Sequence, residues 1–143
     1  MLPEIERAAH LIGTYLEHAL EGLGMTQAEA HLLAQLARRG PTSIATLHHE
    51  FGRKRSTLTN IIDRLESRGL VRREINRADR RSFVIHLTRS GERAAKQVTA
   101  ALDQLEGQVV AAVSARDLKG LDAVASALAV ATRRVGAQHH SER

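Results

Sequence analysis

Residues 54–93 have the sequence KRSTLTNIIDRLESRGLVRREINRADRRSFVIHLTRSGER, in which the hydrophobic period changes at Gly69. Before this glycine, four apolar residues from Leu58 to Leu65 follow a spacing of three and four, which places them on one side of a helix. After it, apolar and polar residues alternate, which is typical of strands. The stretch therefore predicts a helix followed by a β-hairpin.

The predicted hairpin has a strongly basic tip. Residues 76–81, NRADRR, are too polar for a core and have the right length for a turn between two strands. Such a cluster of cations repels itself unless an anion relieves it, and the narrow minor groove of DNA is a strongly negative site that admits arginine. Asp79 either anchors the tip by pairing with a nearby arginine or is an exposed acid without a role. The arginines around this turn are Arg73, Arg77, Arg80 and Arg81.

A short helix is predicted just before the longer one. Ser43 can cap a helix over residues 44–51, and after Gly52 the longer helix runs from about Arg55 to Arg68. Two helices joined by a tight turn predict a helix-turn-helix, whose second helix lies across the major groove and needs one apolar face and one face of short polar side chains. We also expect Ser43 to contact a phosphate. The candidate DNA contacts of the second helix are Lys54, Arg55, Ser56, Thr57, Thr59, Asn60 and Arg64.

Helices are also predicted on both sides of this region. An amphipathic pattern covers residues 4–23, a capping box at Thr26 and Glu29 opens a helix that stops at Gly40, Thr88 opens one that continues to about residue 113, and Ser114 opens the last. The prediction is a mainly α protein with a small antiparallel β-hairpin, one domain over residues 1–143, and a disordered tail over 137–143.

Charge and composition narrow the class of partner. Residues 53–93 hold twelve Lys and Arg but five Asp and Glu, a local excess of seven positive charges, while the whole chain carries +5. Aromatic residues are 2%, too few for base-stacking platforms, so duplex DNA is the nucleic acid we expect. An ordinary solvated basic surface is the alternative. The absence of cysteine excludes disulfides, thiolate-ligated zinc and cysteine redox sensing, and we expect no cofactor.

The N-terminal segment MLPEIERAAH lacks the basic start and apolar run of a signal peptide, and charges interrupt the apolar stretches elsewhere. We therefore expect a cytoplasmic protein without a membrane partner.

Residues 26–95 resemble the DNA-binding core of the MarR (multiple antibiotic resistance regulator) family. The most specific part is Asp79-Arg80-Arg81 followed by Leu87-Thr88 and Gly91, which is similar to the family's D-x-R wing tip and L-T-x-x-G helix start. The resemblance implies a winged helix-turn-helix, a triangular homodimer with recognition helices in successive major grooves, and Arg81 in the flanking minor groove. Two features depart from the family pattern, namely Lys54 in place of a capping Asp or Ser, and the pair His48-His49.

The flanking helices, residues 3–22 and 96–136, are rich in apolar side chains that a lone chain would leave exposed. We expect them to form a homodimer, which predicts a pseudopalindromic operator with half-sites about one helical turn apart. The whole pattern predicts a sequence-specific transcriptional regulator, a repressor, rather than an enzyme.

In MarR-like proteins a small anionic or phenolic ligand commonly binds between the dimerisation helices and the DNA-binding region and weakens DNA binding. By this resemblance, candidate residues of such a cleft are His10, Tyr15, His18 and Arg38, each of which can instead be a simple rim contact.

The sequence gives other functions less support. The eight histidines lack metal-ligand spacing, so we expect no metal site, and no nucleophile, phosphate-loop or paired-carboxylate motif supports catalysis. A nonspecific architectural DNA binder and a winged helix that binds protein remain open as alternatives.

Overall fold

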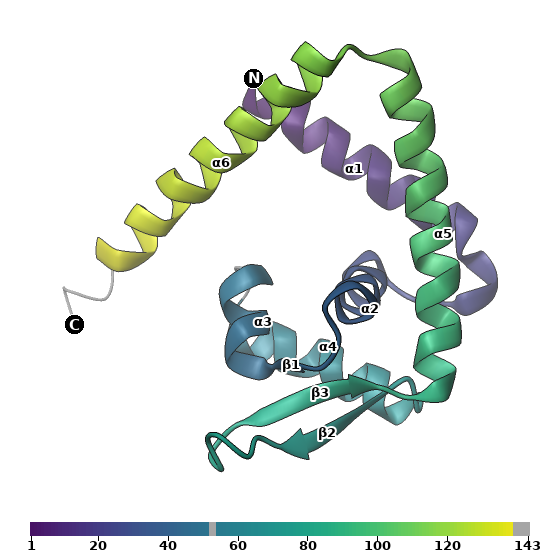
Figure 1. The fold of residues 1–143 in the computed structure, drawn as a ribbon, viewed down its shortest axis with the longest axis vertical. Coiled ribbons are helices and arrows are strands. Elements are labelled where there is room, and N and C mark those ends of the chain that lie inside the picture. The colour runs from purple at the N-terminus through teal and green to yellow at the C-terminus, as the bar shows by residue number, and fades with distance from the viewer. Residues whose placement is uncertain (52–53, 139–143) are drawn as a thin grey trace. The chain divides into compact units, whose positions relative to one another are not determined.

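A computed structural model describes residues 1–51 and 54–138, and the chain forms two compact units, Met1–Asp103 and Gln104–Arg143. The predicted class is confirmed, because helices dominate and one small antiparallel sheet accompanies them (Figure 1). The helices are α1 (Leu2–Ala19), a 3-10 turn η1 (Glu21–Leu23), α2 (Gln27–Arg39), α3 (Ile44–Phe51), α4 (Arg55–Ser67), α5 (Arg89–Ala112) and α6 (Ala115–Gln138).

The first helix ends earlier than its periodicity predicts. α1 stops at Ala19, and Leu20 leaves helical geometry with φ −116° and ψ 18°. The chain then tightens into η1, which Gly24 closes in the left-handed conformation at φ 54°. This break turns Leu20 into the core, where it is buried. A continued helix would also have buried an apolar residue at this position, so apolar spacing alone could not distinguish it from the 3-10 turn.

The predicted caps of α2 and α3 are present. The Glu29 amide donates to Thr26 Oγ1 at 3.3 Å, and the Thr26 amide donates to a Glu29 carboxylate oxygen at 2.8 Å, which completes the capping box. Ser43 Oγ accepts from the Thr46 amide at 3.1 Å and so caps α3.

α4 begins and ends where the sequence predicts. Gly69 takes φ 67°, its amide donates to the Glu66 carbonyl, and the Leu70 amide donates to the Leu65 carbonyl, both at 2.9 Å. This pair of bonds is the Schellman motif, and it turns the chain directly from α4 into the first wing strand.

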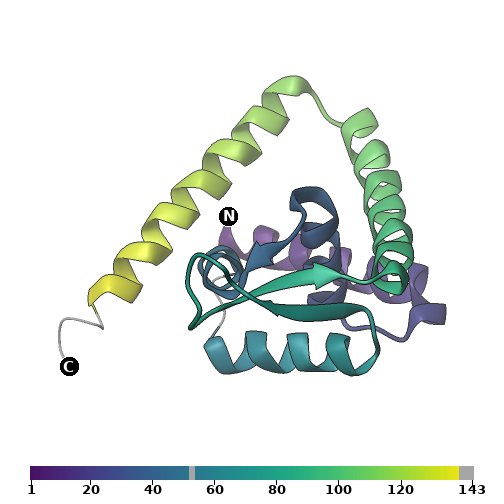
Figure 2. The same ribbon diagram turned by 60° about the horizontal axis from the view of Figure 1, so that its bottom comes forward.

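The sheet has three antiparallel strands in the order β1-β3-β2, with β2 (Val71–Ile75) and β3 (Phe83–Leu87) forming the predicted hairpin. The third strand, β1 (Thr42–Ser43), was not predicted, because two residues are too short to show an alternation. Thr42 pairs with Ile85 and Ser43 with Val84. Figure 2 shows α4 running along one face of the β2–β3 hairpin.

The core of the first unit lies between these elements. Its larger cluster joins buried side chains of α2, α3 and α4 to Val71 and Ile85 of the sheet. A smaller cluster joins Leu16 and Leu20 to α2 and to Val98 of α5. The DNA-binding region predicted over residues 26–95 therefore shares its core with α1 and the start of α5.

The second unit differs from the first in that its side chains are less buried. From residue 104 to residue 132, where the structure describes side-chain exposure, every residue is half-buried or exposed. Asp117 caps the Ser114 amide at 2.9 Å and so opens α6 as predicted. α6 extends to Gln138, and residues 139–143 of the predicted disordered tail lie outside the described residues. None of the helices in the described part of the chain has both the length and the apolar character of a membrane span.

Candidate nucleic-acid interface

α4 presents a polar face opposite its buried stripe. Leu58, Ile61, Ile62 and Leu65 are buried against the core, as the spacing predicted. The opposite side carries short polar side chains, which leaves room for the edges of DNA bases. Of the predicted contacts, Thr57 is half-buried, whereas the exposed ones are Lys54, Arg55, Ser56, Thr59, Asn60 and Arg64.

The start of α4 has a cation where a capping side chain usually stands. Lys54 occupies the N-cap position and makes no capping hydrogen bond through its side chain. The amides of the first helical turn and the positive end of the helix dipole therefore combine with Lys54 and Arg55, which favours an anion at this end.

A buried carboxylate on α2 fixes one flank of α4. The side chain of Glu29 is only 4% exposed, and it pairs with Arg64 Nε at 3.2 Å and with Arg68 at 3.9 Å. Arg68 also donates to the Leu23 and Gly24 carbonyls. Because Arg64 uses Nε for this pair, the contact orients its guanidinium while the side chain stays largely exposed.

A basic residue of the wing fixes the opposite flank. Arg73 of β2 pairs with Asp63 and Glu66 of α4, and its amide donates to Glu66 at 3.2 Å. α4 is thus held by ion pairs on both sides, to α2 and to β2. The β2–β3 hairpin and α4 are therefore joined in one unit.

Side chains within the wing turn hold its shape. Asn76 Oδ1 accepts from the Ala78 amide at 3.0 Å, and Asp79 Oδ1 accepts from the Arg81 amide at 3.1 Å. The Asn76 and Ser82 backbones close the loop with a bond of 2.9 Å. These local bonds fix the turn through its backbone and so set the directions in which its arginines project.

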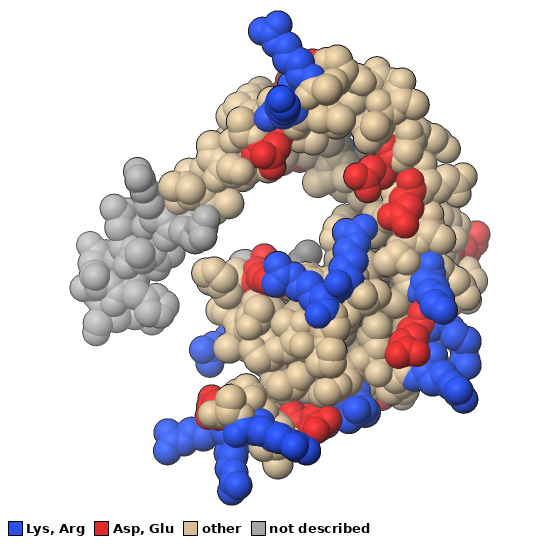
Figure 3. Space-filling view, viewed as in Figure 1, with Lys and Arg blue, Asp and Glu red and all other residues tan. Residues whose placement is uncertain are grey.

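Asp79 therefore has a different role from both alternatives considered for it. It was predicted either to pair with an arginine or to be an exposed acid without a role, and instead it caps the backbone of Arg81. The side chains of Arg77, Arg80 and Arg81 are exposed. Figure 3 shows basic side chains spreading from the hairpin end of this unit.

On the other face of the hairpin, Glu74 balances nearby cations. Arg72 donates to Glu74 at 2.9 Å, and His86 Nε2 lies 3.3 Å from the same carboxylate oxygen. The Arg72 hydrogen bond holds the pKa of the Glu74 carboxyl below its usual value, and the charges of His86 and Arg77 act in the same direction. Glu74 is therefore ionised at neutral pH and offsets the charge of the wing base rather than that of its tip.

Residues 25–83, which hold α2 to α4 and most of the wing, match the sequence model of the MarR family. This segment is therefore similar to the MarR family in sequence. The fold of the chain is that of solved relatives. The S. aureus MepR in DNA-binding conformation superposes with a TM-score of 0.82 at 21% identity, covering 92% of this chain and 98% of that one. The S. aureus MepR–DNA complex gives 0.80 at 20% identity, with 92% and 97% covered. The apo wild-type MarR from E. coli gives 0.70 at 20% identity, with 90% and 96% covered.

The candidate ligand residues lie on α1 and α2, in the same unit as the segment that matches the MarR family. His18 Nδ1 lies 2.7 Å from the Thr14 carbonyl oxygen, and Arg38 pairs with Asp103 at 3.8 Å. Tyr15 is half-buried against the smaller core cluster, whereas His10 is exposed. Each of these side chains thus has a local environment of its own, and the cleft remains a prediction.

The described ranges, 1–51 and 54–138, contain no group of metal ligands. No three His, Asp or Glu side chains there are arranged to hold an ion.

Three residues that shape this candidate interface were not predicted as such from the sequence. Glu29 was predicted as a cap, but its burial beside Arg64 depends on how α2 crosses α4, which periodicity does not encode. Arg73 was counted with the tip arginines, although it lies at the wing base and faces α4. Asn76 had a visible signal, since Asn commonly bonds to the amide two residues later in turns.

Proposed function

We propose that this protein is a sequence-specific DNA-binding transcriptional regulator, a repressor that acts as a homodimer on a pseudopalindromic operator. The observation that carries the proposal is that an exposed polar recognition helix and a rigid arginine-bearing turn belong to one unit, linked through Arg73. The match of residues 25–83 to the MarR family supports it, as does the likeness in fold to a relative crystallised with DNA. A transcriptional regulator must reach the chromosome, so we place the protein in the cytoplasm. We also infer that it binds DNA without catalysing a reaction.

Each part of the site has a separate task in this proposal. Arg81 enters the minor groove and Asn60 pairs with a base edge in the major groove. Ser43, Thr57 and the cations at the start of α4 contact phosphates, which set the register of the protein on the duplex. Two copies related by a two-fold axis read two half-sites about one helical turn apart.

Fluorescence anisotropy with duplexes from the region upstream of the protein's own gene tests this function. Binding should exceed that to random duplexes of equal length by at least about 10³-fold at physiological salt. Arg81→Ala should weaken operator binding by about tenfold or more, since a buried arginine in a narrow groove is lost. No binding to any duplex at low ionic strength would contradict the proposal.

Asn60→Ala separates base recognition from affinity. Loss of a bidentate contact to adenine is expected to cost about 1–3 kcal/mol of discrimination, while binding to random DNA stays unchanged. Titrating one operator duplex and its single-base variants measures this. Equal losses on all sequences would assign Asn60 to the backbone.

A nonspecific architectural binder is the second candidate, favoured by the excess of seven positive charges over residues 53–93. It predicts equal affinity for operator and random duplexes. A winged helix that binds protein predicts that Arg81→Ala and Asn60→Ala leave gel shifts unchanged.

Release by a small phenolic or anionic effector is a further part of the proposal. It is supported by the polar side chains His10, Tyr15, His18 and Arg38 on helices that otherwise pack into a core. Phenolic acids should raise the melting temperature of the protein and lower its affinity for DNA. Flat melting curves across such a series would count against an effector of this class.

A further inference from the structure

The outer half of the wing exposes an apolar pair. Ile75 and Phe83 are direct partners in the β2–β3 register, and they are 58% and 42% exposed. Side chains that face each other across an antiparallel pair lie on the same face of the sheet. Two large apolar side chains thus form one exposed patch just below the turn, where solubility alone would favour polar residues.

This patch lies on the side of the hairpin that faces α4. Alternation along β2 puts Val71, Arg73 and Ile75 on one face, of which Val71 is buried in the core and Arg73 reaches Asp63 and Glu66 of α4. Ile75 continues this row beyond the part that α4 covers. The patch therefore borders the space between the recognition helix and the wing tip.

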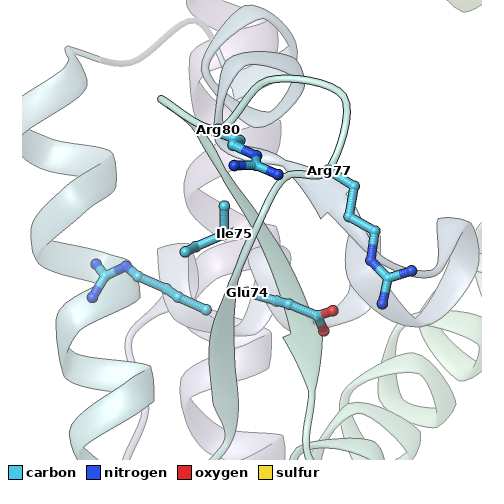
Figure 4. A pocket seen from close by; sticks show the side chains of 5 residues that line it. Glu74, Ile75, Arg77 and Arg80 are labelled. Carbon is cyan, nitrogen blue, oxygen red and sulfur yellow. The ribbon is translucent and has the colours of Figure 1, made fainter.

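The surroundings of Ile75 are hollowed and cationic. A concave region of about 650 Å³ is lined by Arg73, Glu74, Ile75, Arg77 and Arg80. Figure 4 shows Ile75 on one side of its strand, Glu74 and Arg77 directed to the other, and the Arg80 guanidinium above Ile75.

Some of the charged side chains around this hollow have partners of opposite charge, and others do not. Arg73 pairs with the α4 carboxylates of Asp63 and Glu66, and Glu74 pairs with Arg72. Within residues 1–51 and 54–138, no carboxylate lies within 4.0 Å of the Arg77 or Arg80 guanidinium. On the Ile75 side, the hollow thus combines an apolar side chain with the Arg80 guanidinium, while Arg77 lies on the side of Glu74.

The outer edge of β2 adds hydrogen-bond donors. β2 is an edge strand, and the Arg73 amide points away from β3 because it donates to Glu66. Alternation directs the Ile75 amide to the same outer edge. A backbone amide on the strand below the Arg80 guanidinium is a favourable arrangement for a phosphate oxygen.

We propose that this hollow, together with Phe83, the strand partner of Ile75, seats one sugar-phosphate strand of duplex DNA, with the apolar pair against deoxyribose and Arg80 on an adjacent phosphate. The inference rests on the proposed function. When a helix occupies the major groove and a wing the adjacent minor groove, the strand that separates the grooves passes between them. That strand alternates apolar sugars with anionic phosphates, which matches an apolar patch flanked by cations.

Ile75→Thr tests the seat, because threonine keeps the branched shape that strands favour but removes apolar surface. Val84→Thr is the matched control, since Val84 lies on the opposite face of the same hairpin. Anisotropy titrations over a salt series should show that Ile75→Thr lowers affinity about tenfold on upstream and random duplexes alike. The salt slope should stay unchanged because no phosphate contact is lost, while Val84→Thr binds as the parent does.

Phe83→Thr is also expected to lower affinity for upstream and random duplexes. Arg80→Ala should reduce the slope of log affinity against log salt concentration by about 0.9. Melting temperatures of all variants identify any that fail to fold, and Phe83→Thr then replaces Ile75→Thr. Parental affinity in both apolar variants, together with weak binding by Arg81→Ala, overturns the seat and leaves the DNA-binding function intact. A parent protein that binds no duplex overturns both.

Discussion

Gly91 stands at a point in α5 that has no space for a side chain. A Cβ added there would overlap the Leu70 carbonyl oxygen and lie 2.8 Å from the Leu70 carbonyl carbon. The close approach is set by Thr88, whose amide donates to the Leu70 carbonyl at 3.1 Å and whose hydroxyl donates to the Gly69 carbonyl at 2.6 Å. The spacing from Thr88 to Gly91 therefore fastens the wing to the start of α5.

Gly91→Ala is expected to lower the free energy of unfolding by about 2–3 kcal/mol, because backbone atoms on both sides must shift to admit the methyl group. Gly107→Ala in the same helix is the control, since nothing lies within 4 Å of a Cβ there, and it should raise stability by about 0.5–1 kcal/mol through helix propensity. Urea unfolding measures both. Equal effects of the two substitutions would contradict the packing role of Gly91.

Single residues also mark the limit of prediction from the sequence. The spacing of Thr88 and Gly91 was visible, and Thr88 was predicted as a cap, which its bond to the Gly91 amide at 3.0 Å confirms. The contact of Gly91 with Leu70 was not predictable, since it joins residues on different elements. Asp79 shows the same limit, because composition could not distinguish an arginine partner from a backbone amide.

Among the elements, α4 depends on its neighbours for its position. It is held to α2 through Glu29 and to β2 through Arg73, while its own buried stripe packs on the core. Glu29 combines two tasks, since one carboxylate caps α2 and pairs with Arg64 and Arg68. A buried carboxylate with several partners is strongly destabilised when they are removed.

Substitutions at Glu29 separate these tasks. Glu29→Gln retains an acceptor for the Thr26 amide and should lower the free energy of unfolding by about 1 kcal/mol through the lost ion pairs. Glu29→Ala also removes the cap and leaves a void, so about 2–3 kcal/mol is expected. Thermal and urea unfolding measure the difference, and Glu106→Gln, an exposed acid on α5, should change little. Identical losses in the two Glu29 variants would mean that the cap and the filled volume add nothing beyond the charge, and an unchanged stability in Glu29→Gln would mean that the ion pairs contribute nothing.

Prediction from the sequence worked best for elements whose signals are local. The helices from residue 26 onward have side-chain caps or closing glycines that identify their ends, and the hairpin has its own alternation. β1 and the break at Leu20 were missed because both depend on tertiary pairing and burial. The ion pairs that orient α4 were missed for the same reason.

The two compact units of the molecule differ in how they bury apolar surface. The first has a continuous core, whereas the described part of the second, up to residue 132, holds no buried side chain. Exposed apolar residues there include Val109, Val110, Leu121 and Val130. Two isolated helical segments of this kind are marginal in water, so the second unit needs an apolar partner.

A second copy of the chain is the partner we expect, because α1 exposes apolar side chains as well, among them Leu2 and Leu11.

Leu121 is 61% exposed, and Leu121→Glu would place a charge in the proposed dimer interface. Sedimentation should show a dimer for the parent and a shift toward monomer for the variant, and the parent melting temperature should rise with protein concentration. Thr132→Glu on the same helix is the control and should leave the dimer intact, since the Thr132 hydroxyl bonds within α6, to the Leu128 and Ala129 carbonyls. Because a dimer holds two recognition helices on one duplex, dissociation by Leu121→Glu should also lower operator affinity by far more than affinity for a single half-site. A parent that sediments as a single chain at micromolar concentration contradicts the dimer and, with it, the pseudopalindromic operator.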